Sequence, residues 1–137
     1  MRDVFALDAC ALVALLNKEP GAEKVKEILA NAQFGAVDVV MHKLNLLEVY
    51  YGYYRESGKD VADKVIEKTM KLITVVQEIN DALFYEAGRI KAKYRISLAD
   101  SIALAQASIS GAKLLTSDHH EFDVIDGKEN IIFVWLR

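Results

Sequence analysis

One stretch, residues 97–118, constrains the fold of this chain more than any other. Its first part is rich in Ala and Leu, which favour helix, and Gly111 is placed where that helix would stop. The apolar pair 114–115 follows, and such short runs are typical of strands buried on both faces of a parallel sheet. A helix, a tight turn and a strand in succession would bring Asp100 and Asp118 back to the same end of the structure.

The rest of the chain alternates short apolar runs with amphipathic segments, without a long linker or an internal repeat. This alternation is typical of an α/β domain with a parallel sheet, and 137 residues suit one domain with a single core. We therefore predict one three-layer α/β/α domain with a central, mostly parallel five-stranded sheet. The expected strands are 4–7, 37–41, 72–76, 114–115 and 131–135, and the expected helices are 9–16, 22–31, 44–55, 60–71, 81–93 and one that begins at 97.

Charge, cysteine count and hydropathy exclude several classes of protein. The net charge is −3, so there is no overall basic field, and a nucleic-acid partner would have to meet a local patch. Cys10 is the only cysteine, which excludes an intramolecular disulfide and a cysteine-based zinc site. Asp3 and Asp8 interrupt the first residues, and no apolar run reaches the roughly 18 residues that span a bilayer. We predict a soluble, cytoplasmic protein without a membrane partner.

Four acids fall at the carboxyl edge of the predicted sheet, where open parallel sheets form their sites. Asp8 directly follows the first strand, and Asp118 lies just past the fourth. Glu48 lies in the first turns of the helix after the second strand. Asp100 lies in the first turn of a helix that runs back to the fourth strand. Connectivity therefore brings four carboxylates to one edge, while their lateral distances depend on the strand order.

Each acid also has a structural interpretation. Asp8 could cap the following helix, and Asp118 could cap a short turn. Asp100 follows Ser97 at the spacing of a capping box. Glu48 is harder to explain in this way, because its helix is apolar nearly all round and a charge there is costly unless paired or bound to a cation.

Clustered carboxylates raise one another's pKa unless a cation lies among them. Oxygen ligands without cysteine or a histidine cluster select hard ions, here Mg²⁺ or Mn²⁺. Such ions share phosphate oxygens of a substrate, activate a water and stabilise a leaving oxygen. The predicted chemistry is therefore phosphodiester hydrolysis.

Four segments in this order resemble the PIN-domain ribonucleases of the VapC toxin type: 7–16 (LDACALVALL), 44–49 (LNLLEV), 98–105 (LADSIALA) and 114–118 (LLTSD). The resemblance spans nearly the whole chain and implies a single Rossmann-like PIN domain over residues 1–137. It implies a Mg²⁺- or Mn²⁺-dependent endoribonuclease that acts on RNA, forms a homodimer and is silenced by a cognate antitoxin.

The same resemblance assigns roles to individual residues. It makes Asp8, Glu48, Asp100 and Asp118 the catalytic, metal-binding acids, and Thr116 a supporting hydroxyl. Cys10 stands where the family more often has Ser or Thr, which puts a hydroxyl role at that position in doubt.

Further candidates lie outside the matched segments. Asp123 could support the site from a second layer or be a solvated loop charge. Basic residues near the acids could contact a single strand of RNA through its phosphates, or simply lie at solvated helix ends. These RNA-binding candidates are Lys43, Arg89, Lys93 and Arg95.

Four tyrosines in one helix exceed what a single buried face can hold, so this surface is predicted to form a subunit or partner interface. A large core face is the alternative. The tyrosines are Tyr50, Tyr51, Tyr53 and Tyr54.

Two other functions were weighed against the nuclease. A phosphoacceptor domain of receiver type would need an acceptor Asp after the third strand, but Gln77 and Glu78 stand there. A non-catalytic PIN scaffold that only binds RNA or a partner remains an alternative, against which the complete set of acids argues. The RNA that is cut, a preference for RNA over DNA, and the number of ions do not follow from the sequence.

Overall fold

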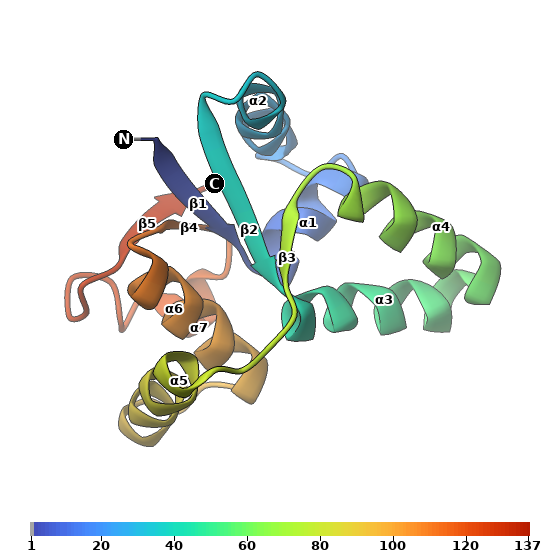
Figure 1. Cartoon of the computed structure of the whole chain (residues 1–137). Helices are drawn as coiled ribbons and strands as arrows, with labels where there is room; N and C mark the ends of the chain where they lie inside the picture. The colour runs from blue at the N-terminus through green and yellow to red at the C-terminus, as the bar shows by residue number, and fades with distance from the viewer. Residues whose placement is uncertain (1) are drawn as a thin grey trace.

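The computed structural model describes residues 2–137 and contains one five-stranded, entirely parallel sheet in the order β3-β2-β1-β4-β5 (Figure 1). The prediction of a mostly parallel five-stranded sheet is confirmed. The strand order places β1 at the centre and brings β4, from the far end of the chain, directly beside it. The strands are β1 (Asp3–Leu7), β2 (Val37–His42), β3 (Thr74–Val76), β4 (Lys113–Thr116) and β5 (Ile132–Trp135).

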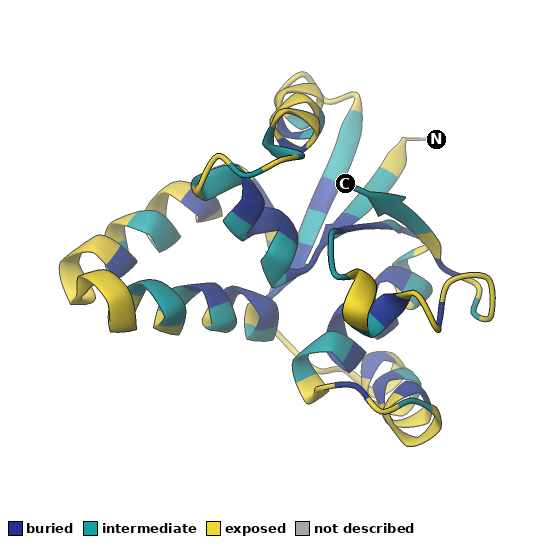
Figure 2. Cartoon of the chain, turned by 180° about the vertical axis from the view of Figure 1, so that it is seen from behind, coloured by how far each residue is buried: buried dark blue, intermediate teal, exposed yellow. Residues whose placement is uncertain are grey.

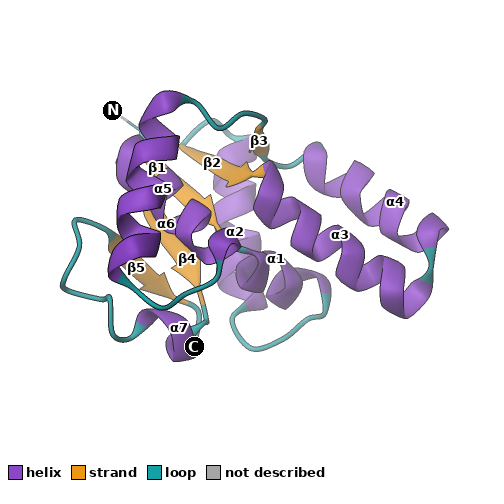
Figure 3. Cartoon of the chain, turned by 90° about the horizontal axis from the view of Figure 1, so that it is seen from below, coloured by secondary structure: helices purple, strands orange, loops and turns teal. Residues whose placement is uncertain are grey.

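Helices cover both faces of the sheet, and one pair of helices extends beyond its edge. Helices α3 and α4 form a hairpin that projects sideways from the layered body, as Figure 3 shows from below. No helix within residues 2–137 is both long and apolar enough to cross a membrane. The helices are α1 (Ala9–Leu16), α2 (Ala22–Gln33), α3 (Lys43–Ser57), α4 (Lys59–Met70), α5 (Asp81–Lys93), α6 (Leu98–Ser110) and α7 (His119–Phe122).

Successive strand residues supply two separate cores, because their side chains point to opposite faces of the sheet. Ala6 and Leu114 join the core under α5 and α6. Their neighbours Leu7 and Leu115 join the core under α1, α2 and α3. Both faces are therefore buried in the middle of the sheet, as Figure 2 shows, which explains the short continuous apolar runs in the sequence. The predicted three-layer α/β/α class is confirmed.

The predicted boundaries differ from the observed ones mainly at short elements. The third strand begins at Thr74 rather than at residue 72, because the turn after α4 uses the two residues before it. The fourth strand is longer than the predicted pair and spans Lys113–Thr116. Helix α7 was predicted only as a possible turn, since four residues carry too little periodicity to show a helix.

The end of β5 packs against the loop between α1 and α2. Gly21 has φ +97°, and a Cβ added there would lie 2.6 Å from the Cβ of Leu136. Arg137 continues the contact by donating to the backbone carbonyl of Pro20. This close approach requires glycine and fixes the loop that follows the first helix of the site.

Candidate active site

Asp8 is the most buried acid of the site, with 2% of its surface exposed. It caps α1, since its Oδ1 accepts the backbone N–H of Ala11 at 2.8 Å. Its Oδ2 accepts the hydroxyl of Thr116, which the pairing of β1 with β4 places beside it. The Thr116 hydroxyl oxygen in turn accepts the backbone N–H of Asp118 at 3.0 Å. Thr116 therefore joins two of the predicted acids.

Burial raises the pKa of Asp8 from its ordinary 3.8 to about 7. The hydrogen bonds from Thr116 and Ala11 oppose this rise in pKa, and the charges of Asp100 and Asp118 add to it. The carboxyl group is thus poised between its two protonation states near neutral pH. A cation beside it would favour the ionised form.

Asp100 lies in the first turn of α6, where the hydroxyl oxygen of Ser97 accepts its backbone N–H at 3.1 Å. Burial raises the pKa of Asp100 to about 6; the Ser97 hydroxyl opposes the rise, and Asp118, Glu48 and Glu121 add to it. The backbone of Asp100 is therefore capped as predicted, while its carboxylate interacts with the charges of other acids; its catalytic role stays a prediction.

Glu48 lies in the second turn of α3 and is half-buried. Burial raises its pKa, the amide of Asn45 opposes the rise, and the charge of Asp118 adds to it. Asp118 caps α7 by accepting the backbone N–H of Glu121 at 3.1 Å. Glu48 lies within α3 and Asp118 caps α7, and the charges of the two side chains interact.

The thiol of Cys10 interacts electrostatically with all four acids. Burial, together with the charges of Asp8, Asp118, Asp100 and Glu48, raises the pKa of its thiol to about 12. The charges of all four carboxylates therefore act on this one side chain. The structure therefore gathers the four predicted acids in one region at the carboxyl edge of the sheet.

The donor set fits a hard divalent cation, because it consists of carboxylate oxygens, and the pKa values of three of the acids, Asp8, Glu48 and Asp100, are raised by burial and by neighbouring charges. Within residues 2–137, no three Asp, Glu, His or Cys side chains approach closely enough to hold one ion together. The acids thus share a region without forming a closed cage. Ions such as Mg²⁺ and Mn²⁺ retain waters and share oxygens of a substrate, so they do not require a closed protein cage.

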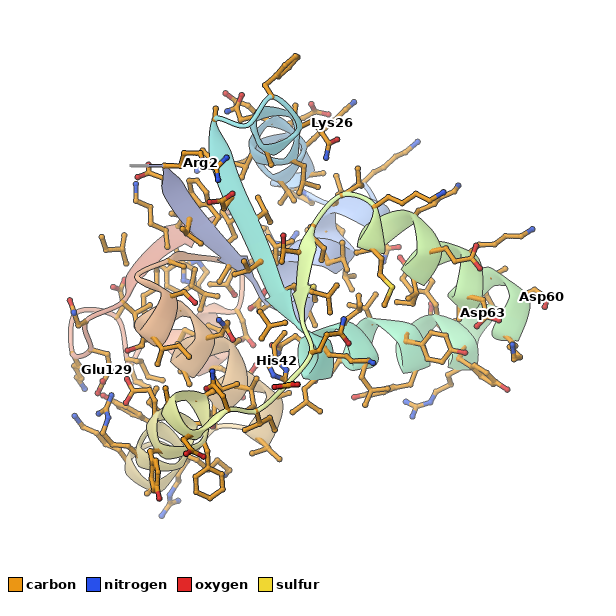
Figure 4. All side chains as sticks on the ribbon, viewed as in Figure 1. Arg2, Lys26, His42, Asp60, Asp63 and Glu129 are labelled. Carbon is orange, nitrogen blue, oxygen red and sulfur yellow. The ribbon has the colours of Figure 1, made fainter. Side chains whose placement is uncertain are left out.

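Two residues that interact with the predicted acids or with their helices were not anticipated from the sequence. Glu121 contributes a charge that raises the pKa of Asp100, and its spacing from Asp118 matches a capping pattern that could have revealed it. His42, buried at the end of β2, caps α3: its Nδ1 accepts the Leu44 N–H at 3.0 Å, which leaves Nε2 to donate to the Glu78 carbonyl at 3.0 Å (Figure 4). His42 therefore fixes the start of the helix that carries Glu48.

Asp123, predicted as a supporting acid, has a side chain that is 61% exposed and that bonds the Nδ1 of His119 at 2.7 Å. The ring of His119 also stacks on Trp135, with 3.9 Å between the ring centroids. Asp123 therefore contacts His119 of α7, which in turn packs against Trp135 at the end of β5. Its supporting role in the site stays a prediction.

The predicted RNA-binding residues divide into two groups. Glu129, whose side chain is only 7% exposed, accepts hydrogen bonds from Arg89 at 2.7 Å, Lys93 at 3.1 Å and Tyr94 at 2.7 Å. Figure 4 shows Glu129 on the loop beside α5, on the opposite side of the molecule from the α3–α4 hairpin. By contrast, Lys43 and Arg95 are exposed and form no ion pair with any residue in 2–137.

The tyrosine surface is smaller than the sequence suggested. Tyr50 donates to Asp63 at 2.8 Å and Tyr53 donates to Asn17 at 2.6 Å, so both are engaged inside the chain. Tyr51 and Tyr54 remain about half exposed.

A larger apolar surface lies where α5 meets α6. It forms a groove of about 760 Å³ whose exposed side chains include Ile79, Phe84, Tyr85 and Leu98. Leu98, the first residue of α6, lines this groove together with residues of α5.

Comparison with known proteins gives a family match over most of the chain. The family model described as the PIN domain matches residues 5–128. No curated protein matches the sequence.

Solved structures with the same fold include toxin–antitoxin complexes. DNA-bound VapBC from Salmonella typhimurium is 18% identical, with a TM-score of 0.77 and 100% of both chains covered. VapBC-1 from nontypeable Haemophilus influenzae is 20% identical, with a TM-score of 0.73, 97% of this chain and 98% of the other covered. The Mycobacterium tuberculosis toxin VapC20, described as cleaving the sarcin-ricin loop, is 15% identical, with a TM-score of 0.61, 88% of this chain and 95% of the other covered. At these identities the structures establish the shared fold.

Proposed function

Because this chain belongs to the PIN-domain family, we propose that it is a Mg²⁺- or Mn²⁺-dependent endoribonuclease whose active site is formed by four carboxylates. The observation that supports this proposal is that burial, and after it the charges of neighbouring acids, raises the pKa values of Asp8, Glu48 and Asp100; Asp118 is one of those neighbours for all three. Acids buried together at the edge of a sheet cost stability, and a bound cation offsets that cost.

The metal-binding residues in this proposal are Asp8, Glu48, Asp100 and Asp118. A divalent ion bound there supplies a Lewis acid for a phosphoryl oxygen and lowers the pKa of a water nucleophile. The chain's own groups orient the acids: the Thr116 hydroxyl and the Ala11 N–H hold both oxygens of Asp8. Burial of Asp8 excludes bulk water from that side of the site.

For the substrate, Lys43 and Arg95 are the cations that we favour for phosphate contact, because both are exposed without an ion pair in residues 2–137. Lys43 is the first residue of α3, which carries Glu48, and Arg95 stands just before α6, which carries Asp100. Arg89 and Lys93 could contact RNA only if they released or shared Glu129. We therefore propose that Arg89 and Lys93 mainly stabilise the fold through their ion pairs with Glu129.

The biological role that we propose is that of the toxin in a type II toxin–antitoxin pair, acting on RNA in the cytoplasm and restrained by a cognate antitoxin. The support is the fold shared with the VapBC complexes from Salmonella and Haemophilus. A reading frame for a small antitoxin next to this gene would support the pairing.

We further propose a homodimer, and we now assign its interface to the α5–α6 groove as well as to the exposed tyrosines. Phe84 and Tyr85 are 62% and 72% exposed, more than Tyr51 or Tyr54. Light scattering at high protein concentration should give twice the monomer mass for the wild type and a lower mass for Phe84→Glu. A strictly monomeric wild type would contradict this assignment.

The cleavage test uses purified protein with single-stranded and structured RNA, in Mg²⁺, in Mn²⁺ and in excess EDTA. We expect cleavage only with metal, and its loss in Asp100→Asn. Asp60→Asn is the matched control, because Asp60 lies at the far end of the α3–α4 hairpin (Figure 4). Cleavage that survives complete chelation would rule out the mechanism, and a wild type that binds RNA without cutting it would favour the non-catalytic scaffold. A DNA strand of the same sequence tests the preference for RNA.

A further inference from the structure

Asn45 is a buried polar residue in the first turn of α3 that neither the four acids nor the family comparison accounts for. None of its surface is exposed. Its Nδ2 donates to the backbone carbonyl of Ala99 at 2.9 Å, across the boundary between α3 and α6. Ala99 directly precedes Asp100, and Asn45 stands one helical turn before Glu48. This one amide therefore links the two helices that each carry a site acid.

The same side chain also has an energetic peculiarity. Its Oδ1 is buried and has no hydrogen-bond partner within residues 2–137. A buried carbonyl oxygen left without a partner lowers the stability of the fold, so the hydrogen bond from Nδ2 to Ala99 is the contribution of this amide that remains to be explained.

We propose that Asn45 is a positioning residue for the carboxylate site: its amide holds the starts of α3 and α6 together, and so sets the separation of Glu48 and Asp100. The inference rests on the proposed metal-dependent activity. Residues that orient metal ligands typically change metal affinity by about 10- to 100-fold when they are replaced.

The chain offers a matched control in Gln106, another buried amide with an unpaired carbonyl oxygen. Its Nε2 donates to the Ser110 hydroxyl at 2.7 Å, within α6 and away from the acids. Replacing either amide removes one hydrogen bond and one unpaired oxygen. Only replacement of Asn45 removes a link between two acid-bearing helices.

The test compares Asn45→Ala, Asn45→Ser and Gln106→Ala with the wild type by urea unfolding and by Mn²⁺ affinity, measured from the rise in melting temperature with Mn²⁺ concentration. Asn45→Ala should weaken Mn²⁺ binding at least tenfold, while its unfolding midpoint in EDTA changes no more than that of Gln106→Ala. Asn45→Ser keeps a short donor and should recover part of the affinity. Gln106→Ala should bind Mn²⁺ as the wild type does.

Cleavage kinetics provide a second readout. Asn45→Ala should lower kcat at saturating Mn²⁺ by at least tenfold and leave KM for RNA within about twofold, since Asn45 is buried and cannot contact RNA. Unchanged Mn²⁺ affinity in Asn45→Ala would overturn the inference. If the wild type binds Mn²⁺ but cuts no RNA, the proposed function fails, and the Mn²⁺ affinities still decide the role of Asn45. A wild type that binds no Mn²⁺ would overturn both.

Discussion

Replacing Asp8 with Asn should make the metal-free protein more stable at alkaline pH. The pKa of Asp8 is raised from 3.8 to about 7 in the folded protein. Folding therefore favours the protonated form of Asp8. The contribution of Asp8 to the free energy of unfolding is fully present below about pH 4 and is lost as the pH rises through about 7. Asn keeps the neutral state at every pH and is as good a helix cap as Asp.

The magnitude follows from linkage. The gap between 3.8 and about 7 corresponds to about 4 kcal/mol once Asp8 is fully ionised, at 1.36 kcal/mol per pH unit. About 3 kcal/mol of this loss should fall between pH 5 and pH 8, because the unfolded chain is already ionised at pH 5. Asp100, with its pKa raised to about 6, adds a further loss in the same direction that both proteins share.

The assay is urea unfolding in EDTA at pH 5, 6, 7 and 8 for the wild type, Asp8→Asn and the exposed control Asp60→Asn. The free energy of unfolding of the wild type should fall with pH, and that of Asp8→Asn should fall by about 3 kcal/mol less. The difference in slope is independent of any fixed cost of losing the charged bond to Thr116. If the free energy of unfolding fell equally with pH in the wild type and in Asp8→Asn, the claim that burial raises the pKa of Asp8 would be refuted.

Three further predictions test other parts of the structure. The thiol of Cys10, with its pKa raised to about 12, should react with a disulfide reagent at pH 8 about 10²- to 10³-fold more slowly than in urea; equal rates would contradict its burial among acids. Glu129→Ala should lower the free energy of unfolding by about 1–3 kcal/mol, because it removes the acceptor of three hydrogen bonds; an unchanged urea midpoint would mean that this network contributes nothing. Gly21→Ala should cost about 1–3 kcal/mol, since its backbone has φ +97° and Leu136 blocks a Cβ, whereas Gly52→Ala, in an open helical position, should be neutral or stabilising in the same assay.

The order of elements and the fold class could be predicted because each helix and strand carries its own local pattern. Strand order could not, since the contact that sets it joins β1 to β4 across most of the chain. The pairing of Asp8 with Thr116 depends on that contact, so the sequence could place both residues at one edge without showing that they touch. The order of the elements along the chain was enough to predict that the acids lie at one edge of the sheet. Which acids interact depends on the order of the strands within the sheet.

Two surfaces show where local pattern misleads. Arg89 and Lys93 look like free cations in the sequence, yet their partner Glu129 lies 40 and 36 residues away along the chain. Tyr50 and Tyr53 look like surplus aromatic surface, and each has a polar partner inside the fold. In both cases the sequence shows residue type and helical face, while the partner that satisfies the side chain comes from a distant segment.

The most direct test of the central claim is equilibrium binding of Mn²⁺, followed by the paramagnetic resonance signal of the free ion. The wild type should bind Mn²⁺ saturably at micromolar to millimolar concentrations. Binding should weaken at least tenfold in each of Asp8→Asn, Glu48→Gln, Asp100→Asn and Asp118→Asn and remain unchanged in Asp60→Asn. Absence of saturable binding by the wild type, or affinities in the four variants equal to that of the wild type, would contradict a metal site built from these carboxylates.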